Sequence, residues 1–230
     1  MPRSTGGLDN AAEWLVFRAL PPDLRDKRLL DLGCGFGWQR RYARRQQARS
    51  VVGVDLSEKM LARARADTHD PGIDYRRSAI EDIDFDDGEF HVAISSLALH
   101  YVERFDLVCQ KVYRCLAAAG VFVLAVEHPI FTALATQQWC LGPSGERLHW
   151  PVDDYQIEGP RHTQWLADDV VKYHRTVAAY VNALIGSGLR ISRLLEPGPP
   201  PEMLAGQPSL KDECRRPPFL LIAAVKPAAP

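Results

Sequence analysis

A glycine-rich loop with an acid before it begins the part of this chain that could bind a cofactor. Asp31 precedes Gly33, Cys34 and Gly35, and a second apolar run ends in Asp55, twenty residues after Gly35. Glycines let the backbone approach a ligand where a side chain would collide. A carboxylate at the tip of the next strand can accept hydrogen bonds from both hydroxyls of a ribose. The spacing therefore predicts a site for a nucleoside-like cofactor.

The loop lacks the spacing that binds a dinucleotide. It reads GCGFGW over residues 33–38, whereas the dinucleotide fingerprint is G-x-G-x-x-G with a helix N-terminus facing a pyrophosphate. Asp31 would repel a pyrophosphate but attract the ammonium group of an amino acid. S-adenosyl-L-methionine carries both that ammonium and a ribose. The charges therefore point to this cofactor, with S-adenosyl-L-homocysteine as its product.

Several motifs resemble those of the class I S-adenosylmethionine-dependent methyltransferases. From residue 28 to about 126 they are LLDLGCGFG, VVGVDLSEKML, FHVAISSLALHYV and GVFVLAVEHP. More narrowly, GCGFGW, SLALHYV, EHPIF, WPVDDY, KYHRT and DECRRP are similar to segments of small bacterial methyltransferases of the small-molecule type. The resemblance implies an α/β, Rossmann-like fold with a seven-stranded, mostly parallel sheet flanked by helices, an insertion after strand five, and a hairpin-like edge formed by the last two strands. It also implies more sequence before GGLDN, so that either the short start leaves the pocket less covered or this chain is truncated.

Alternating hydrophobic patterns predict repeated βαβ winding. The expected strands are 28–32, 50–54, 73–76, 90–95 and 120–126, with helices at 38–47, 57–66 and 104–116. A first helix over 10–20 would be a lid or packing helix. Residues 127–167 show no clear period, and a helix over 168–185, capped by Asp168 and Asp169, precedes strands 189–195 and 219–226. We expect a single domain over 1–230, with a cofactor core at 28–126, a substrate-side insertion and helix at 127–185, and the final strands at 189–226.

The expected cofactor residues lie at the carboxyl ends of these strands, where open α/β sheets bind ligands. Ser57 would cap the helix after the second strand, which brings Met60 near the adenine, although Met60 fits a core position equally well. Ala79 stands where the family often has an acid, so adenine recognition would fall to backbone groups near Ile80 and to Glu81 or Asp82. The full expected set is Asp31, Gly33, Cys34, Gly35, Asp55, Leu56, Met60, Ala79, Ile80, Glu81, Ser95 and Leu97.

The candidate catalytic residues are histidines and charged groups after the fourth and fifth strands. Methyl transfer from a sulfonium is an in-line displacement, so the protein mainly aligns the nucleophile and, for some acceptors, removes a proton. His100 and His128 could each be a base, a substrate contact or a structural group, and Glu127 could bind a cation or hold its loop. On the predicted helix, His174 could face the pocket, and Arg175 could clamp an anion or pair with an acid.

The insertion is rich in aromatic residues, which allows two interpretations. Its members Trp139, Trp150, Tyr155, His162 and Trp165 could wall a pocket for a flat or apolar substrate, or form a small core that fixes the loop. The seven histidines form neither an H-E-x-x-H motif nor a Cys-His cluster, so no metal site is expected.

Composition and charge favour a small-molecule partner. The net charge is −1 and no apolar run is long enough to cross a bilayer, which argues against nucleic acid and membrane. Five scattered cysteines indicate reduced thiols, and the chain start lacks a signal-peptide pattern, so a cytoplasmic location is predicted. The leading hypothesis is methyl transfer from S-adenosyl-L-methionine to a small-molecule oxygen, nitrogen or carbon.

Two alternatives stay open. A catalytically silent cofactor-binding or scaffold protein would fit the missing acid at Ala79. An RNA or protein methyltransferase would use a basic face on the first core helix, formed by Arg40, Arg41, Arg44, Arg45 and Arg49. Such a run is usually a solvated surface.

Overall fold

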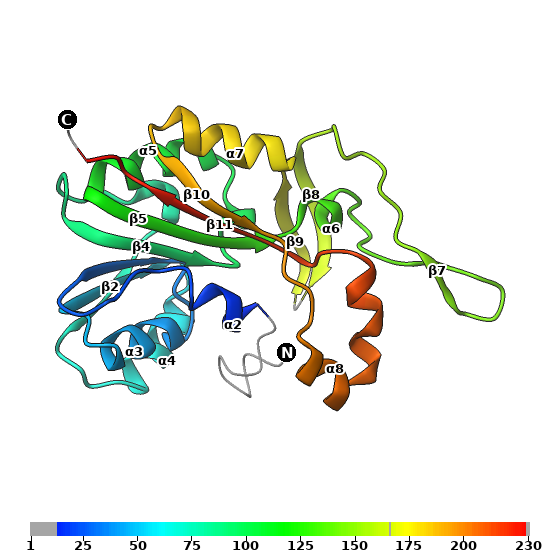
Figure 1. Ribbon diagram of the computed structural model, residues 1–230, viewed down its shortest axis with the longest axis horizontal. Coiled ribbons are helices and arrows are strands. Elements are labelled where there is room, and N and C mark those ends of the chain that lie inside the picture. The colour runs from blue at the N-terminus through cyan, green and yellow to red at the C-terminus, as the bar shows by residue number, and fades with distance from the viewer. Residues whose placement is uncertain (1–12, 166, 229–230) are drawn as a thin grey trace.

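The structure is a computed structural model that describes residues 13–165 and 167–228, and its centre is one twisted sheet (Figure 1). The strand order is β10-β11-β5-β4-β1-β2-β3. The strands are β1 (Arg28–Leu32), β2 (Ser50–Asp55), β3 (Ile73–Arg77), β4 (Phe90–Ser96), β5 (Leu116–Glu127), β10 (Arg190–Leu195) and β11 (Phe219–Val225). β1 to β5 pair in parallel, while β11 runs antiparallel to both β5 and β10. The predicted seven-stranded, mostly parallel fold is therefore confirmed, including its final antiparallel pair.

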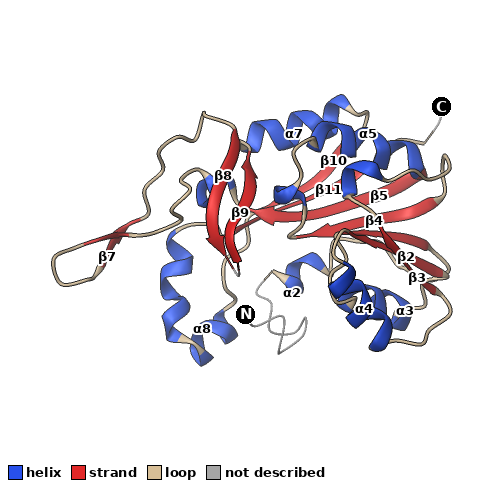
Figure 2. Cartoon of the chain, turned by 180° about the vertical axis from the view of Figure 1, so that it is seen from behind, coloured by secondary structure: helices blue, strands red, loops and turns tan. Residues whose placement is uncertain are grey.

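Helices cover both faces of this sheet (Figure 2). They are α2 (Trp14–Phe17), α3 (Trp38–Arg45), α4 (Glu58–Ala66), α5 (Phe105–Cys115) and α7 (Val177–Gly186). Phe105 of α5 and Tyr180 of α7 pack edge to face, 4.9 Å between ring centroids, in the core of one face. Trp14 of α2 and Ala43 of α3 belong to the core of the other. The central strands are buried on both sides, which is why they read as continuous apolar runs.

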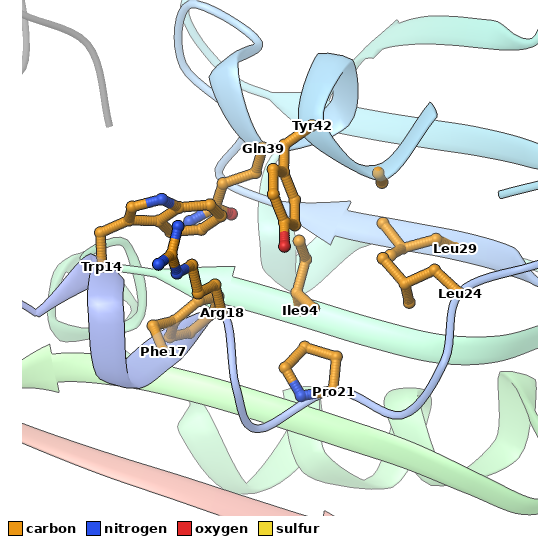
Figure 3. Close-up of a pocket in the computed structure, with 10 residues that line it drawn as sticks. Trp14, Phe17, Arg18, Pro21, Leu24, Leu29, Gln39, Tyr42 and Ile94 are labelled. Atoms are coloured by element: carbon orange, nitrogen blue, oxygen red, sulfur yellow. The ribbon is translucent and has the colours of Figure 1, made fainter. Parts of the chain in front are cut away.

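Helix α2 is shorter than the predicted helix over 10–20, whose residues 10–12 lie outside the described part. Trp14 and Phe17 are buried, and the Trp14 ring meets Tyr42 of α3 at 87° with 4.9 Å between centroids. Figure 3 shows these side chains around a small cavity with Leu29 and Ile94 of the sheet. Its volume of about 20 Å³ is room for about one water, so α2 acts as a packing helix.

The predicted helix over 168–185 is wrong in its first half. Residues Ala167–His174 form strand β9, which pairs antiparallel with β8 (Gly159–Trp165), and α7 begins only at Val177. The cap is Thr176, whose side chain accepts a hydrogen bond from the Ala179 amide at 3.0 Å, and not the Asp168-Asp169 pair. Lys172 and His174 are both fully buried, as expected of alternate residues on one face of a strand.

The insertion after β5 is built of short elements rather than one irregular loop. They are α6 (Pro129–Thr132), β6 (Cys140–Leu141), β7 (Arg147–His149) and the β8–β9 pair. Near the end of the chain, α8 (Pro201–Gly206) is followed by the 3-10 helix η4 (Pro208–Arg215), and the β6–β7 hairpin projects from the body (Figure 1). Arg147 of β7 pairs with Asp212 of η4 at 3.0 Å, so two segments distant in sequence are joined.

Candidate active site

A cavity of about 200 Å³ opens at the carboxyl ends of β1, β2, β3 and β4. Its walls are Gly33, Asp55, Leu56, Ala79, Ile80, Glu81, Ala98, Tyr101 and Val102. The loops after four neighbouring strands thus meet at one edge of the sheet, which is where this fold binds ligands. The wall includes Ala79, Ile80 and Glu81 of the segment at and before the 3-10 turn η2 (Ile80–Asp82), where adenine recognition was expected.

Asp55 is held rigidly at the end of β2. Its Oδ2 accepts the Gly35 amide and its Oδ1 accepts the Ser57 amide, both at 2.8 Å. A carboxylate oxygen has two lone pairs, so each oxygen can accept one more hydrogen bond. Two vicinal hydroxyls of a ribose match this remaining capacity. The fixed carboxylate also joins the glycine loop to the start of α4, where the Ser57 side chain accepts the Met60 amide at 3.3 Å.

The glycine loop leaves room that side chains would fill. Gly33 has φ of 73°, and a Cβ there would lie 2.2 Å from the Cβ of Ala98. Gly35 has φ of 50°, and a Cβ at this position would meet no atom within 4 Å, so space lies open above it. The loop is anchored from below, because the amides of Gly33 and Cys34 both donate to the Val54 carbonyl. An open backbone beside a carboxylate fits S-adenosyl-L-methionine.

Asp31 and Ser95 lie behind this wall rather than in it. Asp31 is 1% exposed, and its Oδ2 lies 3.4 Å from Nη1 of Arg40, with burial raising the pKa of the carboxyl to about 6. The Ser95 hydroxyl donates to the Leu32 carbonyl at 2.9 Å. Cys34, Gly35, Met60 and Leu97 are likewise not among the wall residues.

His100 is buried next to the cavity, in the 3-10 turn η3 (Leu99–Tyr101) after β4. Its ring lies 4.3 Å from the Tyr101 ring, and its Nδ1 accepts the Glu127 amide at 3.4 Å. Burial lowers the pKa of the imidazole to about 4, so the ring is neutral at pH 7. Because Nδ1 accepts, the single proton sits on Nε2. No described residue hydrogen-bonds to Nε2.

His128 and His174 use both ring nitrogens within the protein. His128 Nδ1 accepts the Ile130 amide at 3.0 Å and caps α6, while Nε2 lies 2.7 Å from Glu196. His174 Nε2 donates to the Tyr155 carbonyl at 3.0 Å, and Nδ1 lies 2.8 Å from the Thr132 hydroxyl. Burial is the main cause of a lowered pKa in both rings. Both rings hold the insertion to its neighbours.

Glu127 and Arg175 also have partners inside the chain. Glu127 lies 2.8 Å from Nζ of Lys172, and Gln137 bridges the pair by donating to Glu127 at 3.3 Å and accepting from Lys172 at 3.2 Å. Arg175 donates to the carbonyls of Val102 and Glu103 at 2.6 and 2.5 Å. It therefore clamps the loop that walls the cavity, and among the side chains that the structure describes it forms no ion pair with an acid.

A second cavity of about 480 Å³ lies in the insertion. Its walls are Phe131, Ala135, Thr136, Gln137, Gln138, His162 and Thr163. Gln137, which has φ of 47°, belongs to no motif and was missed by sequence reasoning. Tyr101 lies within the SLALHYV motif, but its place in the wall of the cofactor cavity was missed as well. His162, one of the predicted aromatic residues, lines this cavity, and its Nδ1 lies 2.6 Å from Oδ1 of Asp169.

The tryptophans of the insertion form a small core. Trp150 stacks on Phe131 with 5.1 Å between centroids and meets Trp139 edge to face at 5.3 Å. The Arg216 guanidinium lies 4.0 Å from the centroid of Trp150. The Tyr155 hydroxyl accepts the Val177 amide at 3.2 Å, which fixes the loop to α7. The side chain of Trp165 lies outside the described part.

Two absences hold for the part of the chain that the structure describes. No group of three or more histidine, cysteine or acidic side chains is arranged to hold a metal ion. Among the same residues, no helix combines the length and the apolar character needed to cross a membrane.

Comparison with known proteins agrees with this geometry. The family model of the methyltransferase domain matches residues 30–124. The crystal structure of an S-adenosylmethionine-dependent methyltransferase from Mesorhizobium loti superposes with a TM-score of 0.90 at 47% identity, covering 95% of this chain and all of that one. An uncharacterised protein of Haemophilus influenzae is 33% identical over 95% of this chain and 89% of its own. N-demethylindolmycin N-methyltransferase of Streptomyces griseus is 28% identical over 92% of this chain and 90% of its own. The chain belongs to the class I S-adenosylmethionine-dependent methyltransferases, and S-adenosyl-L-methionine is its cofactor.

Proposed function

We propose that this methyltransferase acts on a small molecule that binds in the cavity of the insertion. The observation that carries the proposal is the size and lining of that cavity. Its volume of about 480 Å³ falls within the range of small-ligand pockets, roughly 300 to 1,000 Å³. Phe131 offers one aromatic wall, while Thr136, Gln137 and Gln138 offer neutral hydrogen-bonding groups. An acceptor with a ring and a few polar atoms suits such a lining.

A short chain of contacts links this cavity to the one at the strand ends. Gln137 of the insertion cavity contacts Glu127, the Glu127 amide donates to His100, and the His100 ring lies against Tyr101 of the cofactor cavity. An acceptor bound beside Gln137 that extends toward the cofactor cavity would therefore approach His100, which is buried next to that cavity. These two side chains are the expected contacts that align the acceptor.

The protonation state of His100 limits the choice of acceptor. S-adenosyl-L-methionine, when bound, supplies an electrophilic methyl group on a sulfonium. His100 keeps its proton on Nε2 and has a pKa of about 4, so it donates a hydrogen bond and does not remove a proton at pH 7. The acceptor then needs a nucleophile with a lone pair already available, such as a neutral amine. The Streptomyces griseus relative, named as an N-methyltransferase of demethylindolmycin, supports a nitrogen acceptor.

The arginines of α3 give little support to an RNA acceptor. Arg40 is fully buried, so the expected basic face lacks one of its members. Arg41 donates to the Phe36 carbonyl at 2.9 Å, and Arg44 pairs with Asp70 at 2.8 Å. Phosphate binding needs several cations directed at solvent. Of the five arginines of the predicted basic face, only Arg45 and Arg49 are exposed.

The proposal is tested by asking which material receives the methyl group. Purified enzyme with isotopically labelled S-adenosyl-L-methionine is incubated with separate small-molecule, RNA and protein fractions of a bacterial lysate. Label is expected in the small-molecule fraction. Transfer to RNA or protein alone would refute the proposal, and cofactor binding without transfer to any fraction would favour the silent scaffold.

A variant pair then tests the insertion cavity with the acceptor so identified. Gln137→Leu should raise the KM for the acceptor about ten-fold, since one hydrogen bond in the wall is lost, with no change in cofactor affinity. Gln110→Leu, at an exposed position on α5, is the matched control. An unchanged KM in Gln137→Leu would place the acceptor elsewhere.

A further inference from the structure

Arg40 occupies a place where an arginine is rarely found. It lies in the first turns of α3, yet its side chain is 0% exposed, whereas charged side chains are almost never fully buried unless paired. Gly53 on β2 makes the room, because a Cβ there would lie 1.9 Å from Nη1 of Arg40. The ring of Tyr75 on β3 lies 4.4 Å from the Arg40 Cζ. Residues from three elements thus form a buried pocket for one guanidinium.

The guanidinium joins two parts of the cofactor loop. Its Nη1 lies 3.4 Å from Oδ2 of Asp31, the acid before the glycines, and its Nη2 donates to the Cys34 carbonyl at 3.3 Å, within the loop. Asp31 Oδ1, Arg40 Nε and the Tyr75 hydroxyl are buried with no hydrogen-bond partner among the described residues. Unpartnered buried polar atoms are costly, and this cluster, which lies behind the glycine loop of the cofactor cavity, indicates where a ligand donor or an ordered water belongs.

We propose that Arg40 is a positioning residue for cofactor binding. It keeps Asp31 ionised and fixes the Cys34 carbonyl, and it leaves Asp31 Oδ1 able to accept from a hydrogen-bond donor of S-adenosyl-L-methionine. Only an ionised carboxylate offers both oxygens as acceptors. Burial by itself would leave a carboxyl group protonated at neutral pH. A permanent cation within the buried pocket opposes that tendency, and arginine is the side chain that does not lose its charge there.

The charges around Asp31 determine the pH range in which its carboxyl group is ionised. Burial raises the pKa of Asp31, Arg40 on α3 lowers it, and the Asp55 carboxylate on β2 raises it, with a result of about 6. Tyr75 faces the guanidinium from β3. Wild-type protein should therefore lose cofactor affinity as the pH falls through about 6. Without the cation, the same loss should begin at a higher pH.

The experiment measures the Kd of S-adenosyl-L-homocysteine and of S-adenosyl-L-methionine by calorimetry between pH 5 and pH 9. Arg40→Met, which keeps the length of the side chain, should move the acid limb of the affinity profile upward by at least one pH unit. For a shift of one unit the affinity relative to wild type should be about two-fold weaker at pH 7, and the difference should grow to nearly ten-fold at pH 5. Arg45→Met, at an exposed position on the same helix, should overlay the wild-type profile.

Two further variants separate positioning from folding. Arg40→Lys keeps a cation and should leave the acid limb within a few tenths of a pH unit, with a loss of affinity that does not depend on pH. Gly53→Ala displaces the guanidinium without changing any charge and should move the acid limb as Arg40→Met does, provided that circular dichroism shows a folded protein. Parallel profiles for Arg40→Met and wild type, or an equal shift in Arg40→Lys and Arg40→Met, would overturn the proposal.

Discussion

Removal of the Lys172 charge should destabilise the protein strongly without loosening the cofactor. Lys172 Nζ lies 2.8 and 2.9 Å from the two oxygens of Glu127, with side chains 1% and 12% exposed. This pair joins β9 of the insertion to the end of β5. Lys172→Met fills a similar volume, so the change isolates the lost charge from lost packing.

The magnitude follows from what the substitution leaves behind. Breaking a buried ion pair from one side costs about 3 to 5 kcal/mol, because the remaining charge has no partner. Here Glu127 keeps some solvent contact and one hydrogen bond from Gln137, so we expect the lower value of about 3 kcal/mol. For a chain of this size that corresponds to a Tm lower by about 6 to 12 °C. The double variant Lys172→Met/Glu127→Gln should regain more than half of the loss.

Urea unfolding followed by circular dichroism measures these differences, with Lys59→Met on the exposed surface of α4 as the control. The control should stay within about 0.5 kcal/mol of wild type. Calorimetry should show an unchanged Kd for S-adenosyl-L-homocysteine in Lys172→Met. A loss below about 1 kcal/mol, or a double variant as unstable as the sum of the single ones, would refute a structural role for the pair.

Three further predictions concern single residues. Asp55→Asn should weaken S-adenosyl-L-methionine binding ten- to a hundred-fold in calorimetry, because two charge-assisted hydrogen bonds become weaker, and unchanged affinity would remove Asp55 from the site. Because burial lowers the pKa of His100 from 6.5 to about 4, this ring should have no effect on the free energy of unfolding above about pH 6.5 and should lower it by up to about 3 kcal/mol as the pH falls toward 4. His100→Gln should flatten that part of the urea-unfolding profile, and an equally steep profile would contradict the assignment. Thr176→Ala should cost about 1 kcal/mol through the lost cap of α7, and Thr176→Ser should restore it.

The cofactor edge could be read from the sequence because its geometry is local. Gly33, Gly35 and Asp55 act through backbone conformation and strand ends, and the spacing of these residues fixes both. The helix predicted over 168–185 failed because Val170 and Val171 suit a helix as well as a strand. Pairing with β8 makes this segment a strand. The local hydrophobic pattern does not reveal that partner, so it could not distinguish a strand from a helix here.

Side-chain partners were the other part that sequence could not supply. His100 and His128 follow β4 and β5, whereas His174 lies on β9 and not on the predicted helix. The hydrogen-bond partners of these rings, such as Glu196 for His128 and Tyr155 for His174, belong to other elements and could not be predicted from the local pattern. Arg40 was assigned to a solvated face because its neighbours are arginines. Its burial depends on the absent side chain of Gly53, thirteen residues later and on another element.

The cofactor side of the site has carboxylate oxygens that can accept further hydrogen bonds, whereas the charged and polar groups of the insertion side are already paired. On the cofactor side, Asp31 keeps an unpartnered oxygen and both oxygens of Asp55 can accept further hydrogen bonds, which suits a ligand with an ammonium and two hydroxyls. On the insertion side, Glu127 and His174 are already bound by Lys172, Thr132 and Tyr155. Those groups stabilise the cavity without offering a charge to its occupant. For an acceptor bound there, as we propose, selection should rest on shape and neutral hydrogen bonds, so single substitutions in this wall should alter acceptor preference more readily than they alter use of the cofactor.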